Sequence, residues 1–151
     1  NGRCEAAEVA ALCLANLYNS GGHRKITPDE YETIKKYLQK FPESMHIRAA
    51  FIIASEAIYS PSAEYKRVPD KIINKAKQWS EQYPKKIEFQ EAYFGLLFSR
   101  LKYAQAQDMR NEQRRVYREM KTVAERANYS EYNESNQLME SVDILHRVFG
   151  Y

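Results

Sequence analysis

The side chains that could do chemistry are few and scattered. His23, His46 and His146 are far apart in the sequence, and none belongs to an HExxH-type metal motif, so we interpret them as surface or hydrogen-bonded histidines. Cys4 and Cys13 stand in an apolar run without a CxxC pair. We interpret both cysteines as small buried hydrophobes in a reducing compartment rather than as disulfide partners or metal ligands.

Sequence motifs for catalysis and phosphate binding are missing. The chain contains no P-loop, GxSxG, GxGxxG or acidic calcium loop, and its 5 scattered glycines leave little material for a phosphate cradle. We therefore predict no catalytic residues, no cofactor and no metal, and we do not expect the protein to be an enzyme.

The densest basic run is MRNEQRRVYREMK. On a helix that turns about 100° per residue, four cations fall within about 80° of one another and form a basic stripe. This basic stripe consists of Arg110, Arg114, Arg118 and Lys121. Glu112 and Glu119 interrupt the run, so we interpret the stripe as a solvated helix face, and RNA binding through it stays open as an alternative.

Composition favours a helical chain without a strong charge bias. The 151 residues include 23 basic and 20 acidic side chains mixed along the sequence, so nucleic acid is not the favoured partner. Glycine and proline number only 5 each, whereas helix-favouring residues are plentiful, which predicts an all-α fold. The length suits one domain over 1–151, and the start at Asn1 rather than Met suggests a domain excised from a longer protein.

The apolar run EAAEVAALCLANLY near the start is not a membrane span. It carries Glu5 and Glu8 and is far shorter than the ~20 residues that a membrane-spanning helix needs. We interpret it as a buried helix, predict no membrane span, and expect a cytoplasmic protein.

The clearest local signal is the TPDE segment. Thr27 can cap a helix, Pro28 suits its first position, and Glu30 stands where a capping box places its carboxylate. Pro42 then disfavours helical geometry at Phe41, which predicts a helix over 28–41. The other expected helices are 4–19, 44–60, 69–83, 86–106, 109–127 and 131–149.

Apolar spacing predicts which helices lie in the core. The helix over 44–60 is apolar around most of its circumference and should be covered on several sides, with Phe51 inside. The helix over 86–106 is largely apolar as well. The last helix should bury Leu138, Val142, Leu145 and Phe149.

Two aromatic–proline steps reveal an internal repeat. Phe41-Pro42 and Tyr83-Pro84 are separated by 42 residues, and flanking positions agree in character at that offset, such as Tyr37 with Trp79 and Phe51 with Tyr93. Each repeat would be a helix, a tight turn and a more apolar helix. Periods of 20 to 50 residues are typical of stacked helical hairpins that cannot bury their apolar faces alone.

This pattern resembles the tetratricopeptide (TPR) family. Leu14-Ala15 with Tyr18, then Gly21-Gly22 and the helix that ends at Phe41-Pro42, is similar to one hairpin of that family. The resemblance implies an α-α superhelix of about three TPR-like hairpins, which pair 4–19 with 28–41, 44–60 with 69–83, and 86–106 with 109–127. The helix over 131–149 would be a C-terminal cap. An irregular α-α superhelix outside the family is the alternative.

The resemblance also implies a concave groove lined by the first helix of each hairpin. The residues that would point into this groove are Asn16, Asn19, His46, Glu56, Glu88, Glu91 and Phe98. Of the family's carboxylate clamp only Asn16 fits, so we expect no binding of chaperone tails of that type.

We therefore predict a scaffold that binds a peptide or helix of a partner protein in the groove. The alternative from another class is a regulatory or sensor segment of a larger signalling protein. An RNA-binding helical repeat is the third reading.

Overall fold

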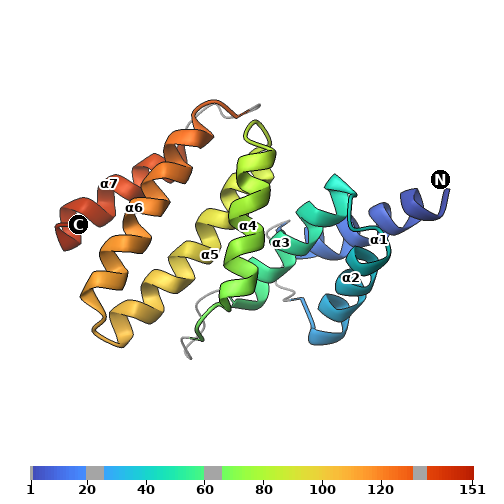
Figure 1. Ribbon diagram of the computed structural model, residues 1–151, viewed down its shortest axis with the longest axis horizontal. Helices are drawn as coiled ribbons and strands as arrows, with labels where there is room; N and C mark the ends of the chain where they lie inside the picture. Colours follow the sequence, from blue (N-terminus) through green and yellow to red (C-terminus); the bar gives the residue numbers. More distant parts are fainter. Residues whose placement is uncertain (1, 20–25, 60–65, 131–135) are drawn as a thin grey trace. The chain divides into compact units, whose positions relative to one another are not determined.

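The computed structural model describes residues 2–19, 26–59, 66–130 and 136–151, apart from the side chains of residues 2 and 16–19. Within these ranges the chain forms seven α-helices and no strand, which confirms the predicted all-α class (Figure 1). The helices are α1 (Gly2–Asn19), α2 (Pro28–Lys40), α3 (Met45–Tyr59), α4 (Asp70–Gln82), α5 (Ile87–Ala106), α6 (Arg110–Ala127) and α7 (Gln137–Phe149). Their arrangement as a superhelix of TPR-like hairpins stays a prediction.

The chain divides into two compact units. The N-terminal unit, residues 1–58, holds α1, α2 and nearly all of α3, and the C-terminal unit, residues 59–151, holds α4 to α7. The expected pairing of 44–60 with 69–83 joins residues of different units and stays a prediction, as does the single domain over 1–151.

The start of α2 is capped as the sequence predicts. The Glu30 N–H donates to Thr27 Oγ1 at 3.2 Å, and the Thr27 N–H donates to Glu30 Oε1 at 3.2 Å. This reciprocal pair satisfies two N–H groups that have no partner inside the helix, so the local sequence alone fixes where α2 begins.

The two aromatic–proline turns share one backbone geometry. Phe41 ends α2 at φ −129° and ψ 64°, and Tyr83 ends α4 at φ −118° and ψ 61°. The N–H of each aromatic residue donates to a carbonyl four residues earlier at 2.8 Å, and each carbonyl accepts from the N–H three residues later. This correspondence is what the 42-residue offset predicts for the turns.

A buried polar side chain supports each turn from the following helix. Arg48, in α3, donates through Nε to the Pro42 carbonyl at 2.7 Å. Gln90, which stands 42 residues later in α5, donates to the carbonyls of Ser80 and Tyr83, both at 3.0 Å. Both side chains are buried and provide donors for carbonyls that the ending helix leaves free.

In the N-terminal unit, α2 and α3 pack through an aromatic contact. The rings of Tyr31 and Phe51 are stacked with centroids 5.7 Å apart, and the Tyr31 hydroxyl lies 2.7 Å from Ser55 Oγ. Phe51 is 4% exposed, in agreement with the prediction that α3 is central.

The prediction for the first helix is wrong in part. Of its described side chains, only Ala7, Ala11 and Ala15 are buried, whereas Val9 is 62% exposed and Cys13 is exposed. These alanines recur every fourth residue, so the buried part of α1 is one narrow stripe; Leu12 and Leu14 beside it are only partly buried. Cys4 is only partly buried, so neither cysteine is the buried hydrophobe that we expected.

In the C-terminal unit the four helices pack in sequence order, each against the next. The contacts run from α4 to α5, from α5 to α6 and from α6 to α7, with those between α5 and α6 the most extensive (Figure 1). The central helix α5 buries side chains along its whole length, from Phe89 to Ala104.

A buried polar cluster joins the ends of α4 and α6 to the start of α5. Ser80 Oγ donates to Gln90 Oε1 at 2.5 Å, and Arg126 Nη1 donates to Ser80 Oγ at 2.6 Å. Ser80 and Gln90 are fully buried, so an unpaired polar atom here would lose water without compensation. The cluster therefore fixes how these three helix ends meet.

The last helix departs from prediction at one position. Val142 and Leu145 are buried as expected and Leu138 is partly buried, but Phe149 is 48% exposed. Its ring stacks on Tyr151 at 5.5 Å, and the Tyr151 hydroxyl is hydrogen bonded to Gln105 and Gln113. Tyr151 therefore occupies the space against α5 and α6 that a buried Phe149 would have filled.

We expect Phe51→Asp to unfold at least the N-terminal unit, because it places an unpaired charge in the most apolar helix, at a cost above about 4 kcal/mol. Thermal melting followed by circular dichroism measures the effect. Val9→Asp, at an exposed position of the same unit, is the control and should melt like the wild type. Unchanged melting of Phe51→Asp would show that the core is misassigned.

We expect Gln90→Met to destabilise the C-terminal unit by about 2–4 kcal/mol, because the Ser80 and Tyr83 carbonyls lose their donors while the side-chain volume is kept. Urea unfolding provides the measurement. The matched control is Gln78→Met, at an exposed position of α4, which should change stability by less than about 0.5 kcal/mol. Equal effects of the two changes would contradict the role of Gln90.

Candidate binding cleft

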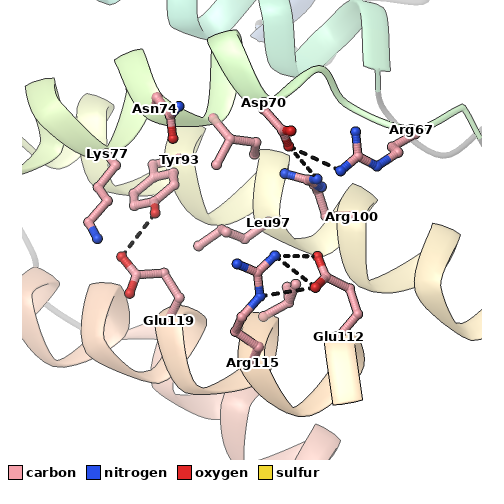
Figure 2. Close-up of a pocket in the computed structure, with 12 residues that line it drawn as sticks. Arg67, Asp70, Asn74, Lys77, Tyr93, Leu97, Arg100, Glu112, Arg115 and Glu119 are labelled. Carbon is pink, nitrogen blue, oxygen red and sulfur yellow. Dashed lines mark hydrogen bonds and ion pairs between the residues drawn. The ribbon is translucent and has the colours of Figure 1, made fainter. Parts of the chain in front are cut away.

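A cleft of about 560 Å³ lies in the C-terminal unit, between α4, α5 and α6 (Figure 2). Each helix lines it with residues spaced by three or four, which places them on one face over two turns. The lining residues are Asp70, Ile73, Asn74 and Lys77 from α4, Tyr93, Leu97 and Arg100 from α5, and Glu112, Arg115, Val116 and Glu119 from α6. Arg67, just before α4, completes the lining.

One end of the cleft is an arginine–carboxylate cluster. Asp70 Oδ1 accepts from Arg100 Nη2 at 2.6 Å and from Arg67 Nη2 at 3.1 Å. The neighbouring pair is bidentate: Arg115 donates to Glu112 through Nη2 at 2.8 Å and through Nε at 3.0 Å. The Arg100 side chain is 6% exposed, whereas those of Arg67 and Asp70 are 46% and 65% exposed. A buried arginine thus anchors an otherwise solvated group.

The same arginines shift the pKa values of both carboxyl groups. The hydrogen bond and charge of Arg100 lower the pKa of Asp70, with a smaller contribution from Arg67. The hydrogen bond from Arg115 lowers the pKa of Glu112, and the charges of Arg100 and Arg67 add to this shift. Each arginine therefore acts on more than its direct partner, so the cluster behaves as one electrostatic group.

The other end of the cleft is polar but carries fewer ion pairs. The Tyr93 hydroxyl donates to Glu119 Oε1 at 2.9 Å, and burial followed by the charge of Glu119 raises the pKa of Tyr93. Lys77 and Asn74 are exposed and, within the described part of the chain, make no hydrogen bond or ion pair. These two side chains are thus available to a ligand.

The groove residues expected from the TPR resemblance do not line this cleft. Glu88, Glu91 and Phe98 lie on α5, and at 100° per residue they fall on the side opposite Tyr93, Leu97 and Arg100. Glu88 is exposed and Phe98 is partly buried under Lys102, whose Nζ lies 5.2 Å from the ring centroid. Glu91 is exposed, but desolvation by its neighbours raises its pKa, and the charge of Glu88 adds to this effect.

The remaining groove residues belong to the N-terminal unit. His46 is exposed in the first turn of α3, and Glu56 is partly buried near its end, where desolvation raises its pKa. Asn16 and Asn19 belong to α1, but their side chains lie outside the described part of the chain. The expected groove draws on residues of both units and stays a prediction. The interpretation of His23 as a surface or hydrogen-bonded histidine also stays a prediction, because His23 falls outside the described residues.

The basic stripe lies on the opposite face of α6 from the cleft. Its members, Arg110, Arg114, Arg118 and Lys121, are all exposed. Arg110 and Arg114 also border a smaller hollow of about 190 Å³ with Phe149 and Tyr151. The cleft and the stripe are therefore separate surfaces that can be changed independently.

Sequence reasoning missed the cleft, although two signals were present. Arg100 is a lone charge in the apolar segment of α5, and a buried charge needs a partner from another element. Glu112, Arg115 and Glu119 recur at three and four residues with alternating sign, on the side of α6 away from the stripe. Both signals point to a charged interface on one side of the core.

The described residues contain neither a candidate membrane span nor a candidate metal site. No helix there is long and apolar enough to cross a membrane. No group of three or more histidine, cysteine, aspartate or glutamate side chains there is placed to hold a metal ion. Comparison of the chain with family models, curated proteins and solved structures finds no match.

We expect Asp70 and Glu112 to titrate below their ordinary pKa values, because the arginines stabilise the ionised carboxylates. The stability they contribute is present above the unfolded-state pKa values near ~4 and is lost as the pH falls through the lower folded values. NMR titration of the carboxyl carbons measures both midpoints. Arg100→Gln should raise the Asp70 midpoint and the control Arg110→Gln should not; an unmoved midpoint in Arg100→Gln would contradict the ion pair.

Proposed function

We propose that this protein is an interaction scaffold that binds a peptide segment of a partner protein in the cleft between α4, α5 and α6. The observation that carries the proposal is the cleft itself, which combines about 560 Å³ of open space with polar side chains from three helices. Buried and exposed charges of both signs meet there, which suits a polypeptide with its own charges and hydrogen-bonding groups.

The dimensions of the cleft support a peptide. Asp70 and Lys77 are seven residues apart on α4, which corresponds to about 10 Å along the helix axis. An extended peptide covers that distance with about three residues. Pockets for small molecules are mostly apolar and enclose their ligand, whereas charged side chains border this cleft.

The chemistry of the lining favours binding over proton transfer. A general acid or base works best with a pKa near the working pH. The pKa values of Asp70 and Glu112 are lowered and that of Tyr93 is raised, so all three pKa values lie away from pH 7. Around pH 7 the two carboxylates therefore stay ionised and Tyr93 stays neutral, which gives a ligand a fixed electrostatic pattern to match.

Nucleic acid fits this surface less well. Asp70, Glu112 and Glu119 offset three of the four cations that line the cleft, which leaves too little positive charge for a run of phosphates. The basic stripe on the other face of α6 is the surface that an RNA ligand would prefer.

A steric block of the cleft tests the proposal. Peptides are selected from a random display library with the whole chain as bait, and their affinities are then measured for the wild type and for variants. Asn74→Trp, an exposed helix position in the cleft, should weaken the selected peptides by about tenfold or more, because the indole fills space that the peptide needs. The matched control Asn111→Trp, at an exposed position of α6 outside the cleft, should bind them like the wild type.

Three outcomes would overturn the proposal. The first is that no peptide is enriched, and the second is that Asn74→Trp binds the selected peptides like the wild type. The third is loss of binding in Arg114→Glu/Arg118→Glu with full binding by Asn74→Trp, which would move the site to the basic stripe. We expect that double variant to keep the wild-type melting temperature within about 2 °C, because both side chains are solvated.

A further inference from the structure

We infer that the segment bound in the cleft is acidic, with one carboxylate seated between Arg67 and Arg100 and a second carboxylate about three residues away at Lys77. This inference rests on the proposed function and names the chemical class of the partner. It follows from the charge balance of the cleft and from the hydrogen-bond donors that its arginines leave unused.

The arginine end of the cleft carries excess positive charge. Three guanidinium groups, those of Arg67, Arg100 and Arg115, stand there against the carboxylates of Asp70 and Glu112. Glu112 is already engaged in a bidentate pair with Arg115. Arg67 and Arg100 share a single oxygen of Asp70, so two cations there are balanced by one anion.

Unused donors at Arg67 and Arg100 point to the missing anion. A guanidinium carries five N–H donors, but each of these arginines makes one hydrogen bond among the described residues. No buried side-chain nitrogen or oxygen in the described part of the chain lacks a partner, so the remaining donors of Arg100 reach the open cleft. A carboxylate matches such a fork with two parallel hydrogen bonds.

The anion site is preorganised. The Arg100 side chain is 6% exposed and is held by Asp70, so it loses little conformational freedom when a ligand arrives. Arg67 is half exposed and reaches the same oxygen from the segment before α4. One fixed guanidinium and one adjustable guanidinium can therefore close around an incoming carboxylate.

The second contact comes from the position of Lys77. It lies two helical turns from Asp70 on the same face of α4, about 10 Å along the axis, and has no partner among the described residues. A segment in the polyproline II conformation has three residues per turn and rises about 3.1 Å per residue. If its first carboxylate sits at Arg67 and Arg100, the side chain three residues later points to the same side about 9 Å away, near Lys77. Ile73 and Leu97 line the cleft between these ends and suit a small apolar residue.

A carboxylate suits this cleft better than a phosphate. The excess over the whole lining is a single positive charge, because Lys77 is balanced by Glu119. Two separate carboxylates place one negative charge at each end of the cleft, whereas a phosphate dianion concentrates its charge at the arginine end, close to Asp70 and Glu112. The second carboxylate gains from its direct contact with Lys77 at the exposed end of the cleft.

Capped synthetic peptides test this inference. The probe contains two glutamates three positions apart with alanines between them, and its matched peptides carry glutamine or lysine at both positions. We expect the glutamate peptide to bind about tenfold or more tightly than the glutamine peptide, with affinity falling as salt is added. The lysine peptide should not bind, and inorganic phosphate and a short oligouridylate should compete only weakly.

Paired substitutions locate each carboxylate. Arg67→Gln should weaken the glutamate peptide about tenfold and leave the glutamine peptide unchanged, while the matched control Arg110→Gln should change neither. Lys77→Gln should weaken binding of the glutamate peptide, but it should not change binding of a peptide whose second glutamate is replaced by glutamine. A double-mutant cycle measures this coupling. Arg67 and Lys77 are exposed, and melting temperatures confirm that each variant is folded.

The outcomes separate this inference from the proposed function. If the library peptides that Asn74→Trp blocks are neutral or basic, the acidic partner is wrong while the scaffold stands. If the glutamine peptide binds as tightly as the glutamate peptide, or if Arg67→Gln has no selective effect, the inference is overturned. Tighter binding of the oligouridylate than of the glutamate peptide would also overturn it and would point to RNA.

Discussion

The apolar surface of α5 has to be covered on more than one side, and the C-terminal unit is organised by this requirement. Its buried residues include Phe89, Ala92 and Phe94, which point in different directions around the helix. One neighbouring helix covers only a single stripe, so both α4 and α6 pack on α5. The cleft lies over the strip of α5 between these two neighbours, and Tyr93, Leu97 and Arg100 form its floor. The core and the candidate site therefore have the same origin.

The helix ends in this core need polar side chains in an otherwise apolar environment. Where a tight turn stops a helix, its last carbonyls lose their intrahelical donors, and burial denies them water. Gln90 and Arg48 supply those donors from corresponding positions of the two hairpins. Each is a polar residue within an apolar helix, and the need for a hydrogen-bond donor explains why an apolar residue does not occupy its position.

The sequence determines the helices more clearly than it determines the cleft. Local signals such as the TPDE cap and the prolines after Phe41 and Tyr83 act within a few residues, so the boundaries of α2 and α4 fall within about two residues of prediction. Burial depends on what packs against each face, which is why Val9, Cys13 and Phe149 were misassigned to the core. The cleft brings together Asp70, Arg100 and Arg115 from three helices, and that meeting depends on helix rotation that periodicity does not fix.

The stability of the C-terminal unit and the charge pattern of its cleft are largely separable. The helices are held by apolar packing on α5, whereas the Arg67–Asp70 pair is about half exposed, and such pairs contribute only about 0–1 kcal/mol. A partner's carboxylate can therefore replace water at Arg67 without disturbing the core. Arg100 differs, because its buried side chain needs an anion at all times, and Asp70 provides that anion before any ligand arrives. The cleft thus keeps one charge pair for the fold and leaves the solvated charges around it free to determine which segment binds.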